Sequence, residues 1–334
     1  MKCETMMKVM AAVMVCGSLM SPWGGMAALA VPAEPPKNVE ITKILNKGVN
    51  DYAPDTAFEF TVAPGKEQAG TASTQKVYAG PAGGVTVGGK IQSKPGEGDI
   101  GSTQLTVGTT NLVLHEEKFT KPGVYRYIVS EKAGTYDGVT YSAEKKWFDV
   151  YVDNNKKIYS YTFTNPSAPE KKDDGIFENR YELKDLTVEK SVKGVQGDRS
   201  KAFDFTILIN GAAGEKYYGV MSNGAKVTFD TGVSKTIQLK DTETIVIYGL
   251  SPKDTFDVRE TDYATDGYKT TVDGGAGREK QGSLSADQSV KFVNTKEGAA
   301  PTGIFTERMP YVVMIAAGAG MLLVFSRRKD RPEA

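Results

Sequence analysis

The sequence AFEFTV at residues 57–62 recurs as AFDFTI at residues 202–207, and this repeat decides the fold. The two stretches match position by position in residue type. Each follows a segment that ends in lysine, Ile41-Thr42-Lys43 in the first half of the chain and Thr187-Val188-Glu189-Lys190 in the second. A match at several separate points predicts an internal duplication of one structural unit.

Further segments repeat in the same order. An aromatic segment that ends in glutamate occurs at 125–131 and again at 255–260, and each half closes on an apolar strand that carries an asparagine. Two copies of one β design predict two β-sandwich domains in tandem, with a boundary near residues 181–185. Other strands are expected at 147–152, 159–163 and 244–248, whereas the glycine-rich segment 79–101 is expected to form loops.

The composition favours β structure and excludes several classes of function. The chain has 334 residues, enough for two domains and targeting segments, and its 41 basic and 41 acidic side chains give no electrostatic reason to expect nucleic acid as a partner. Cys3 and Cys16 are the only cysteines and His115 is the only histidine. We therefore expect no metal, no cofactor and no enzyme acting on a separate substrate. Trp147 is expected in the core.

The N-terminus has the features of a secretory signal peptide. A mostly apolar run at residues 6–20 precedes Ala28-Leu29-Ala30, so cleavage after the last alanine makes Val31 the first mature residue and residues 1–30 the signal. A membrane anchor is the alternative, but the apolar run is short and interrupted. Lipidation of Cys16 is a weaker alternative, because Val15 is not the small residue expected before a lipidated cysteine.

The C-terminal segment, residues 297–334, has three parts in a fixed order. Ala299-Ala300-Pro301-Thr302-Gly303 precedes a 15-residue apolar stretch at 311–325 and a basic cluster at 327–329. This order resembles the cell-wall sorting signal of sortase substrates. The resemblance implies a short transmembrane helix, cleavage between Thr302 and Gly303, and transfer of the Thr302 carboxyl to an amine. Because Ala299 replaces the usual leucine, a pilus-specific sortase is favoured; a plain tail anchor is the alternative.

Three polar residues in each half share a strand face with apolar residues, because side chains alternate between the two faces of a strand. Lys190 shares its face with Leu186, Val188 and Val192; Glu260 with Phe256 and Val258; and Asn294 with Val290 and Phe292. In the first half the same arrangement is predicted for Lys43, Glu131 and Asn179. One lysine, one glutamate and one asparagine are thus predicted to point into each core.

Two interpretations of these buried triads are open. The first is a buried lysine–glutamate ion pair completed by asparagine, although buried pairs stabilise only weakly. The second is chemical: burial lowers the pKa of a lysine amine and raises that of a glutamate. A neutral amine is a nucleophile, and a protonated glutamate can polarise the asparagine carboxamide and move protons. With water excluded and the groups close together, a lysine–asparagine isopeptide bond would form with release of ammonia.

The order lysine in the first strand, glutamate in a middle strand and asparagine in the last resembles the self-crosslinking domains of streptococcal-type backbone pilins. The resemblance covers about residues 37–303. It implies an all-β fold of two tandem Ig-like (Cna-B-type) β-sandwiches, at residues 31–181 and 182–296. It also implies two bonds, Lys43–Asn179 with Glu131 and Lys190–Asn294 with Glu260. Asn154 and Asn165 are alternative partners for Lys43.

The same resemblance implies a function as the shaft subunit of a covalent pilus on the cell surface. Thr302 of one subunit would be joined to an exposed lysine of the next, and the family spacing favours Lys172, with Lys171 as the alternative. Expected partners are further copies of the chain, a pilus sortase, ancillary pilins and cell-wall peptidoglycan. The alternative functions are a monomeric wall-anchored adhesin with the same crosslinks and, least favoured, a wall-anchored enzyme.

Overall fold

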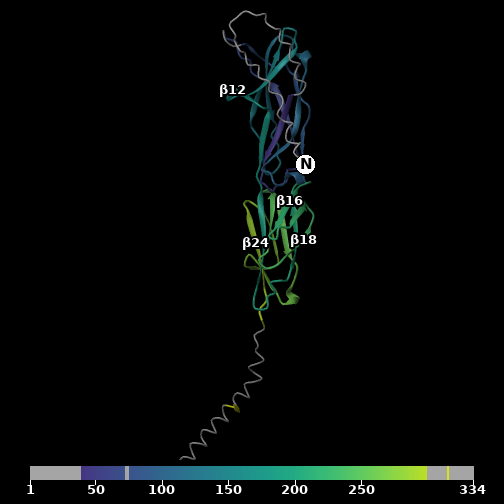
Figure 1. Ribbon diagram of the computed structural model, residues 1–334, viewed down its shortest axis with the longest axis vertical. Coiled ribbons are helices and arrows are strands. Elements are labelled where there is room, and N and C mark those ends of the chain that lie inside the picture. The colour runs from purple at the N-terminus through teal and green to yellow at the C-terminus, as the bar shows by residue number, and fades with distance from the viewer. Residues whose placement is uncertain (1–38, 72–74, 299–313, 316–334) are drawn as a thin grey trace, which may run out of the picture. The chain divides into compact units, whose positions relative to one another are not determined.

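The computed structural model describes residues 39–71, 75–298 and 314–315, whose regular secondary structure is almost entirely β-strand (Figure 1). The predicted signal peptide and the motif Pro301-Thr302-Gly303 lie outside the described residues. Of the predicted apolar helix only Met314 and Ile315 are described, and both are helical. Within the described part of the chain, no helix is both long enough and apolar enough to span a membrane. The described residues belong to one compact unit, which contains both sets of strands.

The first half of the chain forms two main sheets. One has the strand order β5-β7-β1-β13-β9 and the other β12-β11-β10-β8-β3, with β4 paired to β8 and a separate ribbon of β2 and β6. The elements are β1 (Val39–Asn46), β2 (Thr56–Phe58), β3 (Phe60–Pro64), β4 (Val77–Ala79), β5 (Val85–Val87), β6 (Ile91–Ser93), η1 (Glu97–Asp99), β7 (Gln104–Leu114), η2 (Glu116–Lys118), β8 (Gly123–Glu131), β9 (Val139–Thr140), β10 (Lys145–Val152), β11 (Ile158–Asn165), β12 (Ala168–Asp173) and β13 (Ile176–Tyr181).

The second half repeats this design with sheets of order β17-β16-β19-β14-β24-β21-β22 and β18-β15-β20-β23. Its elements are β14 (Lys184–Lys193), β15 (Phe203–Asn210), β16 (Lys216–Met221), β17 (Lys226–Asp230), β18 (Lys235–Leu239), β19 (Thr244–Leu250), β20 (Thr255–Glu260), η3 (Ala264–Asp266), β21 (Lys269–Val272), β22 (Gly275–Ala276), β23 (Glu279–Ser283) and β24 (Gln288–Thr295). The predicted tandem β architecture is confirmed.

The first and last strands of each half lie side by side and run parallel. β1 pairs with β13 so that Lys43 is opposite Phe177, and β14 pairs with β24 so that Lys190 is opposite Phe292. In both halves the asparagine, Asn179 or Asn294, follows two residues after the position opposite the lysine. Residues two apart on a strand share a face, so each lysine and asparagine project into the same core.

Each half has its own apolar core between its two sheets. The repeat that identified the duplication lies inside these cores, because Phe58 and Phe203 are fully buried and occupy equivalent positions. Phe60 packs against Phe177 with ring centroids 5.2 Å apart, and Phe205 packs against Phe292 at 5.1 Å. The same aromatic pair therefore lies beside the first and last strands in both sandwiches.

Two expectations from the sequence are wrong. The glycine-rich segment 79–101 is not only loop: β5 pairs with β7 and β6 pairs with β2, because these short stretches satisfy the backbone groups of exposed strand edges. Trp147 does not belong to the core cluster. It lies half-buried on the outer face of β10, where its ring stacks on the Arg126 guanidinium at 3.8 Å, while its neighbour Phe148 is fully buried.

Candidate intramolecular crosslink sites

The structure brings Lys43, Glu131 and Asn179 together in the first core. Glu131, at the end of β8 in the facing sheet, lies between the other two side chains. Lys43 Nζ donates to Glu131 Oε2 at 3.0 Å, and Asn179 Nδ2 donates to Glu131 Oε1 at 2.9 Å. The side chains of Lys43 and Glu131 are fully shielded from solvent, and Asn179 is 1% exposed. Each carboxylate oxygen thus contacts one of the two nitrogens that a crosslinking reaction would involve.

The second core holds Lys190, Glu260 and Asn294 in a similar arrangement. Lys190 Nζ donates to Glu260 Oε1 at 2.8 Å, and Asn294 Nδ2 donates to the same oxygen. All three residues are buried, with at most 2% exposure. Glu260 Oε2 and Asn294 Oδ1 have no hydrogen-bond partner among the described residues, although both are buried. Buried oxygens without a hydrogen-bond donor are destabilising. A proton shared between these two oxygens would supply the missing hydrogen bond and stabilise the site.

Aromatic rings shield each lysine amine from water. Lys43 Nζ lies 5.1 Å from the centre of the Phe58 ring, and Lys190 Nζ lies 4.1 Å from the centre of the Phe203 ring. These two phenylalanines are the equivalent residues of the duplicated stretch. The repeat therefore supplies the same apolar wall to both lysines, and such a wall excludes the water that would otherwise solvate the charged amine.

Burial shifts the pKa values of these groups in the directions that favour their neutral forms. Desolvation lowers the pKa of the Lys43 amine, and it lowers the pKa of Lys190 to about 8, although the neighbouring glutamates oppose both shifts. Desolvation also raises the pKa of Glu260, against the opposing effect of Lys190. Both shifts increase the share of the neutral amine and of the neutral carboxyl at the second site, and these are the reactive forms of the two groups.

These shifts predict a pH dependence for a variant that cannot crosslink. In Asn294→Ala the Lys190 amine persists, and its folded-state pKa of about 8 lies below the usual lysine value of 10.5. Between these values the unfolded chain binds more protons, so the free energy of unfolding should rise as pH increases from 8 to 10.5. Urea unfolding of the variant and the parent across this range measures the difference. Other groups titrate in both proteins and contribute equally to the slope of the free energy of unfolding against pH. Equal slopes in the two proteins would therefore contradict the prediction.

The alternative partners for Lys43 lie elsewhere. Asn165 ends β11, and its Oδ1 accepts the backbone N–H of Ser167 in the turn before β12. Asn154 lies in the exposed turn between β10 and β11. Neither has a hydrogen bond to Lys43 or Glu131, whereas Asn179 contacts Glu131 directly. The geometry favours Asn179 because parallel pairing of β1 and β13 places it beside the lysine.

Comparison with known proteins gives a consistent result. Residues 39–182 match the family of Spy0128-like isopeptide containing domains, and residues 184–296 match a domain family of unknown function. A pilin of Streptococcus pyogenes serotype M1 is 27% identical over 250 residues, which are 66% of this chain and 72% of that pilin. The chain is a homologue of the streptococcal major pilins. The crystal structure of the Streptococcus pyogenes major pilin covers 78% of this chain and 99% of its own, with 24% identity and a TM-score of 0.58, which shows a shared fold.

A second relative matches a smaller part of the chain. The pilus tip adhesin Cpa of Streptococcus pyogenes is 32% identical over 126 residues, which are 36% of this pilin homologue but only 18% of the adhesin. Pilins of this family are structural proteins.

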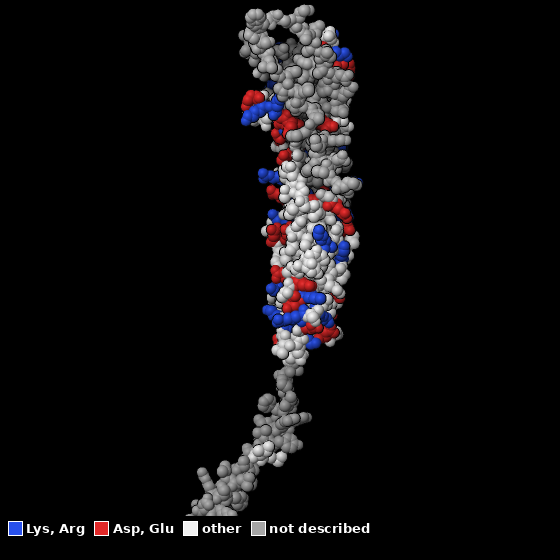
Figure 2. All heavy atoms as spheres, viewed as in Figure 1, with Lys and Arg blue, Asp and Glu red and all other residues white. Residues whose placement is uncertain are grey.

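The two candidate acceptor lysines of this pilin homologue lie on β12, the outermost strand of its sheet. Lys171 and Lys172 are both exposed, and Lys172 lies opposite Thr164 on β11. β12 projects from the side of the first sandwich in Figure 1, and acidic and basic side chains gather at the same place in Figure 2. Asp173 fixes the end of this strand, because its carboxylate accepts a hydrogen bond from the buried amine of Lys146.

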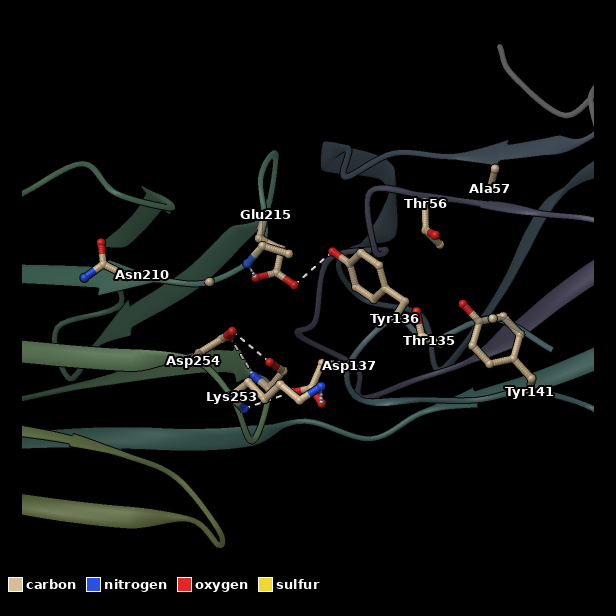
Figure 3. A pocket seen from close by; sticks show the side chains of 14 residues that line it. Thr56, Ala57, Thr135, Tyr136, Asp137, Tyr141, Asn210, Glu215, Lys253 and Asp254 are labelled. Carbon is tan, nitrogen blue, oxygen red and sulfur yellow. Dashed lines mark hydrogen bonds and ion pairs between the residues drawn. The ribbon is translucent and has the colours of Figure 1, made fainter.

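The sequence did not predict the polar contacts between residues of the two sandwiches (Figure 3). Tyr136 and Glu215 point toward each other there, and the Tyr136 hydroxyl donates to Glu215 Oε1 at 2.9 Å. The backbone N–H of Lys253 donates to Asp137 Oδ2 at 2.9 Å. Burial raises the pKa of Glu215. These residues lie in or beside loops, where no strand periodicity marks them.

Proposed function

We propose that this protein is the shaft subunit of a sortase-assembled covalent pilus, with its two sandwiches at residues 31–181 and 182–296 closed by internal isopeptide bonds. The buried lysine–glutamate–asparagine triad, present once in each core, is the observation that carries the proposal. An ion pair alone gives little reason for one arrangement to occur twice, because desolvation cancels much of its Coulomb energy. A covalent bond in each sandwich gives such a reason.

The proposed reaction proceeds once in each domain and needs no cofactor. The neutral lysine amine attacks Cγ of the asparagine, and an Nζ–Cγ bond forms. The glutamate moves a proton from Nζ to Nδ2, the Cγ–Nδ2 bond breaks, and ammonia leaves. At the second site, rotation of the Asn294 carboxamide by half a turn would bring Oδ1 to Glu260, whose protonated form could then polarise the carbonyl. Glu131 and Glu260 act once each, so the protein is no enzyme in the ordinary sense.

Assembly of the shaft would use two further sites. A pilus sortase would cleave after Thr302 and join its carboxyl to an amine of the next subunit, and Lys172 is the favoured acceptor. Its exposure on an edge strand supports this choice, because the amine must enter the active site of another protein. Ancillary pilins and cell-wall peptidoglycan would receive the same carboxyl at the ends of the polymer. The secretion signal and the C-terminal helix would retain the subunit at the membrane until cleavage.

Replacement of Lys172 tests the assembly proposal. In cells that contain the cognate sortase, Lys172→Ala should abolish the ladder of covalent multimers seen on denaturing gels of cell-wall extracts. Lys171→Ala is the matched control and should leave the ladder intact, because the neighbouring amine persists on the same strand. A ladder that survives Lys172→Ala but not Lys171→Ala would move the acceptor by one residue. The absence of a ladder from the parent protein would favour the monomeric wall-anchored adhesin instead.

A further inference from the structure

The two crosslink sites differ in what contacts the asparagine carbonyl oxygen. At the first site, Asn179 Oδ1 accepts the backbone N–H of Ser142 at 2.8 Å. At the second site, Asn294 Oδ1 is buried and has no partner among the described residues. The two triads therefore present the same three side chains but different environments for the oxygen on which charge develops during amide exchange.

The fold explains this difference. β9 is only two residues long and pairs with β13 through Thr140 opposite Arg180. Residues 141–144 then leave the sheet and connect to β10, which brings the Ser142 N–H against the Asn179 side chain. In the second half, β21 is longer and pairs with β24 from Lys269 opposite Thr295 to Val272 opposite Phe292, so that Thr270 lies opposite Asn294. The β21 backbone beside Asn294 stays paired within the sheet. It does not leave the sheet and cross the asparagine side chain, as residues 141–144 do in the first half.

We propose that the Ser142 backbone N–H acts as an oxyanion donor for formation of the first crosslink; this inference rests on the proposed self-crosslinking. Attack of Lys43 Nζ on Asn179 Cγ moves an electron pair onto Oδ1, and the N–H already aimed at Oδ1 stabilises that charge. Glu131 takes one proton from Nζ and then delivers that proton to Nδ2, so the amine loses one hydrogen and the leaving nitrogen gains it. Ammonia then leaves as the carbonyl re-forms.

At the first site, proton transfer and stabilisation of the carbonyl oxygen are carried out by different groups. Glu131 contacts the attacking and leaving nitrogens with separate oxygens, and the carbonyl oxygen is held by the backbone. At the second site, Lys190 and Asn294 both contact Oε1 of Glu260. Glu260 must therefore both move protons and polarise the carbonyl, whereas Glu131 needs only to move protons.

Ser142 allows a test with a matched control, because only its backbone N–H contacts the site. Its hydroxyl oxygen instead accepts the backbone N–H of Glu144 at 3.2 Å. Ser142→Pro removes the N–H, and Ser142→Ala keeps it while removing the hydroxyl. Both variants and the parent are made by cell-free translation, sampled over time, and digested so that each crosslinked peptide pair is quantified by mass spectrometry.

The expected result is specific to one site. Ser142→Pro should form the first crosslink about 100- to 1,000-fold more slowly than Ser142→Ala, which is the effect of removing one oxyanion donor. The second crosslink should form at the parent rate in both variants. Equal rates for the first crosslink in the two variants would overturn the inference. Absence of crosslinks from the parent would instead overturn the proposed function.

If Ser142→Pro unfolds the first sandwich, hydrogen exchange in other variants provides a second test of the inference. Lys43→Ala cannot crosslink and keeps Asn179, so the Ser142 amide should remain protected by its bond to Oδ1. In Lys43→Ala with Asn179→Ala, that amide should exchange about tenfold faster, as expected for the loss of one hydrogen bond. Equal protection of the Ser142 amide in both variants would show that the bond is not made in solution, and the inference would fail.

Discussion

The chain from Val31 to Thr302, expressed without a sortase, will weigh two ammonia molecules less than its sequence requires. Each buried triad should lose one ammonia as its lysine and asparagine join. Glu131→Ala should restore one ammonia and Glu260→Ala the other, because without the glutamate no group moves protons between the two nitrogens. Intact-mass spectrometry measures the deficit, and digestion assigns each crosslinked pair. A parent mass equal to the sequence mass would contradict both bonds at once.

Loss of a crosslink should also cost much stability. The proposed Lys190–Asn294 bond would close a loop of roughly 100 residues, which is worth about 4–5 kcal/mol on the chain-entropy model. Glu260→Ala should lower the free energy of unfolding of the second sandwich by at least this amount, since it also leaves Lys190 buried beside an empty space.

The matched control for this measurement is Glu189→Ala. Glu189 precedes Lys190 on β14 but faces outward, where it meets Lys291 at 3.5 Å in an exposed pair. Exposed pairs contribute about 0–1 kcal/mol, so this variant should keep its crosslink and nearly all of its stability. If Glu260→Ala and Glu189→Ala lost similar stability in urea unfolding, the crosslink would not be the source of the effect.

Pulling the chain between Lys172 and Thr302 should extend the parent protein very little. The proposed covalent route runs from Lys172 through Asn179 to Lys190, across the isopeptide bond to Asn294, and on to Thr302. The interior of the second sandwich lies outside this route. In Asn294→Ala the bypassed segment of roughly 100 residues must carry the load, and unfolding should add about 350 Å at roughly 3.4 Å per residue. Single-molecule force spectroscopy measures this extension.

Asn179→Ala is the control for this experiment. It removes the first crosslink, but the segment between Lys43 and Asn179 lies almost wholly outside the path from Lys172 to Thr302. We therefore expect little added extension from this variant. If Asn294→Ala extended no further than the parent, the load path would be wrong even if both crosslinks were present.

Sequence alone determined the tandem β design and the side chains that face each core. Strand periodicity is a local property, since residues two apart share a face whatever the strand pairs with. A lysine on an otherwise apolar face is also a strong local signal, because burial of an unpaired charge is expensive. These two facts were enough to name Lys43, Lys190 and the glutamate in each half, whereas the choice of Asn179 over Asn154 and Asn165 rested on the resemblance to backbone pilins.

Tertiary structure decided what each buried group meets. Lys43 lies on β1 and Lys47 directly follows that strand at the same parity, yet Lys43 contacts Glu131 while the Lys47 amine donates to the backbone carbonyls of Asp99 and Ser102. The Ser142 N–H reaches Asn179 because the chain leaves the sheet after β9. Such contacts depend on the pairing and register of segments far apart in the chain. No local pattern encodes them, because a backbone donor or acceptor is the same in every residue type except proline.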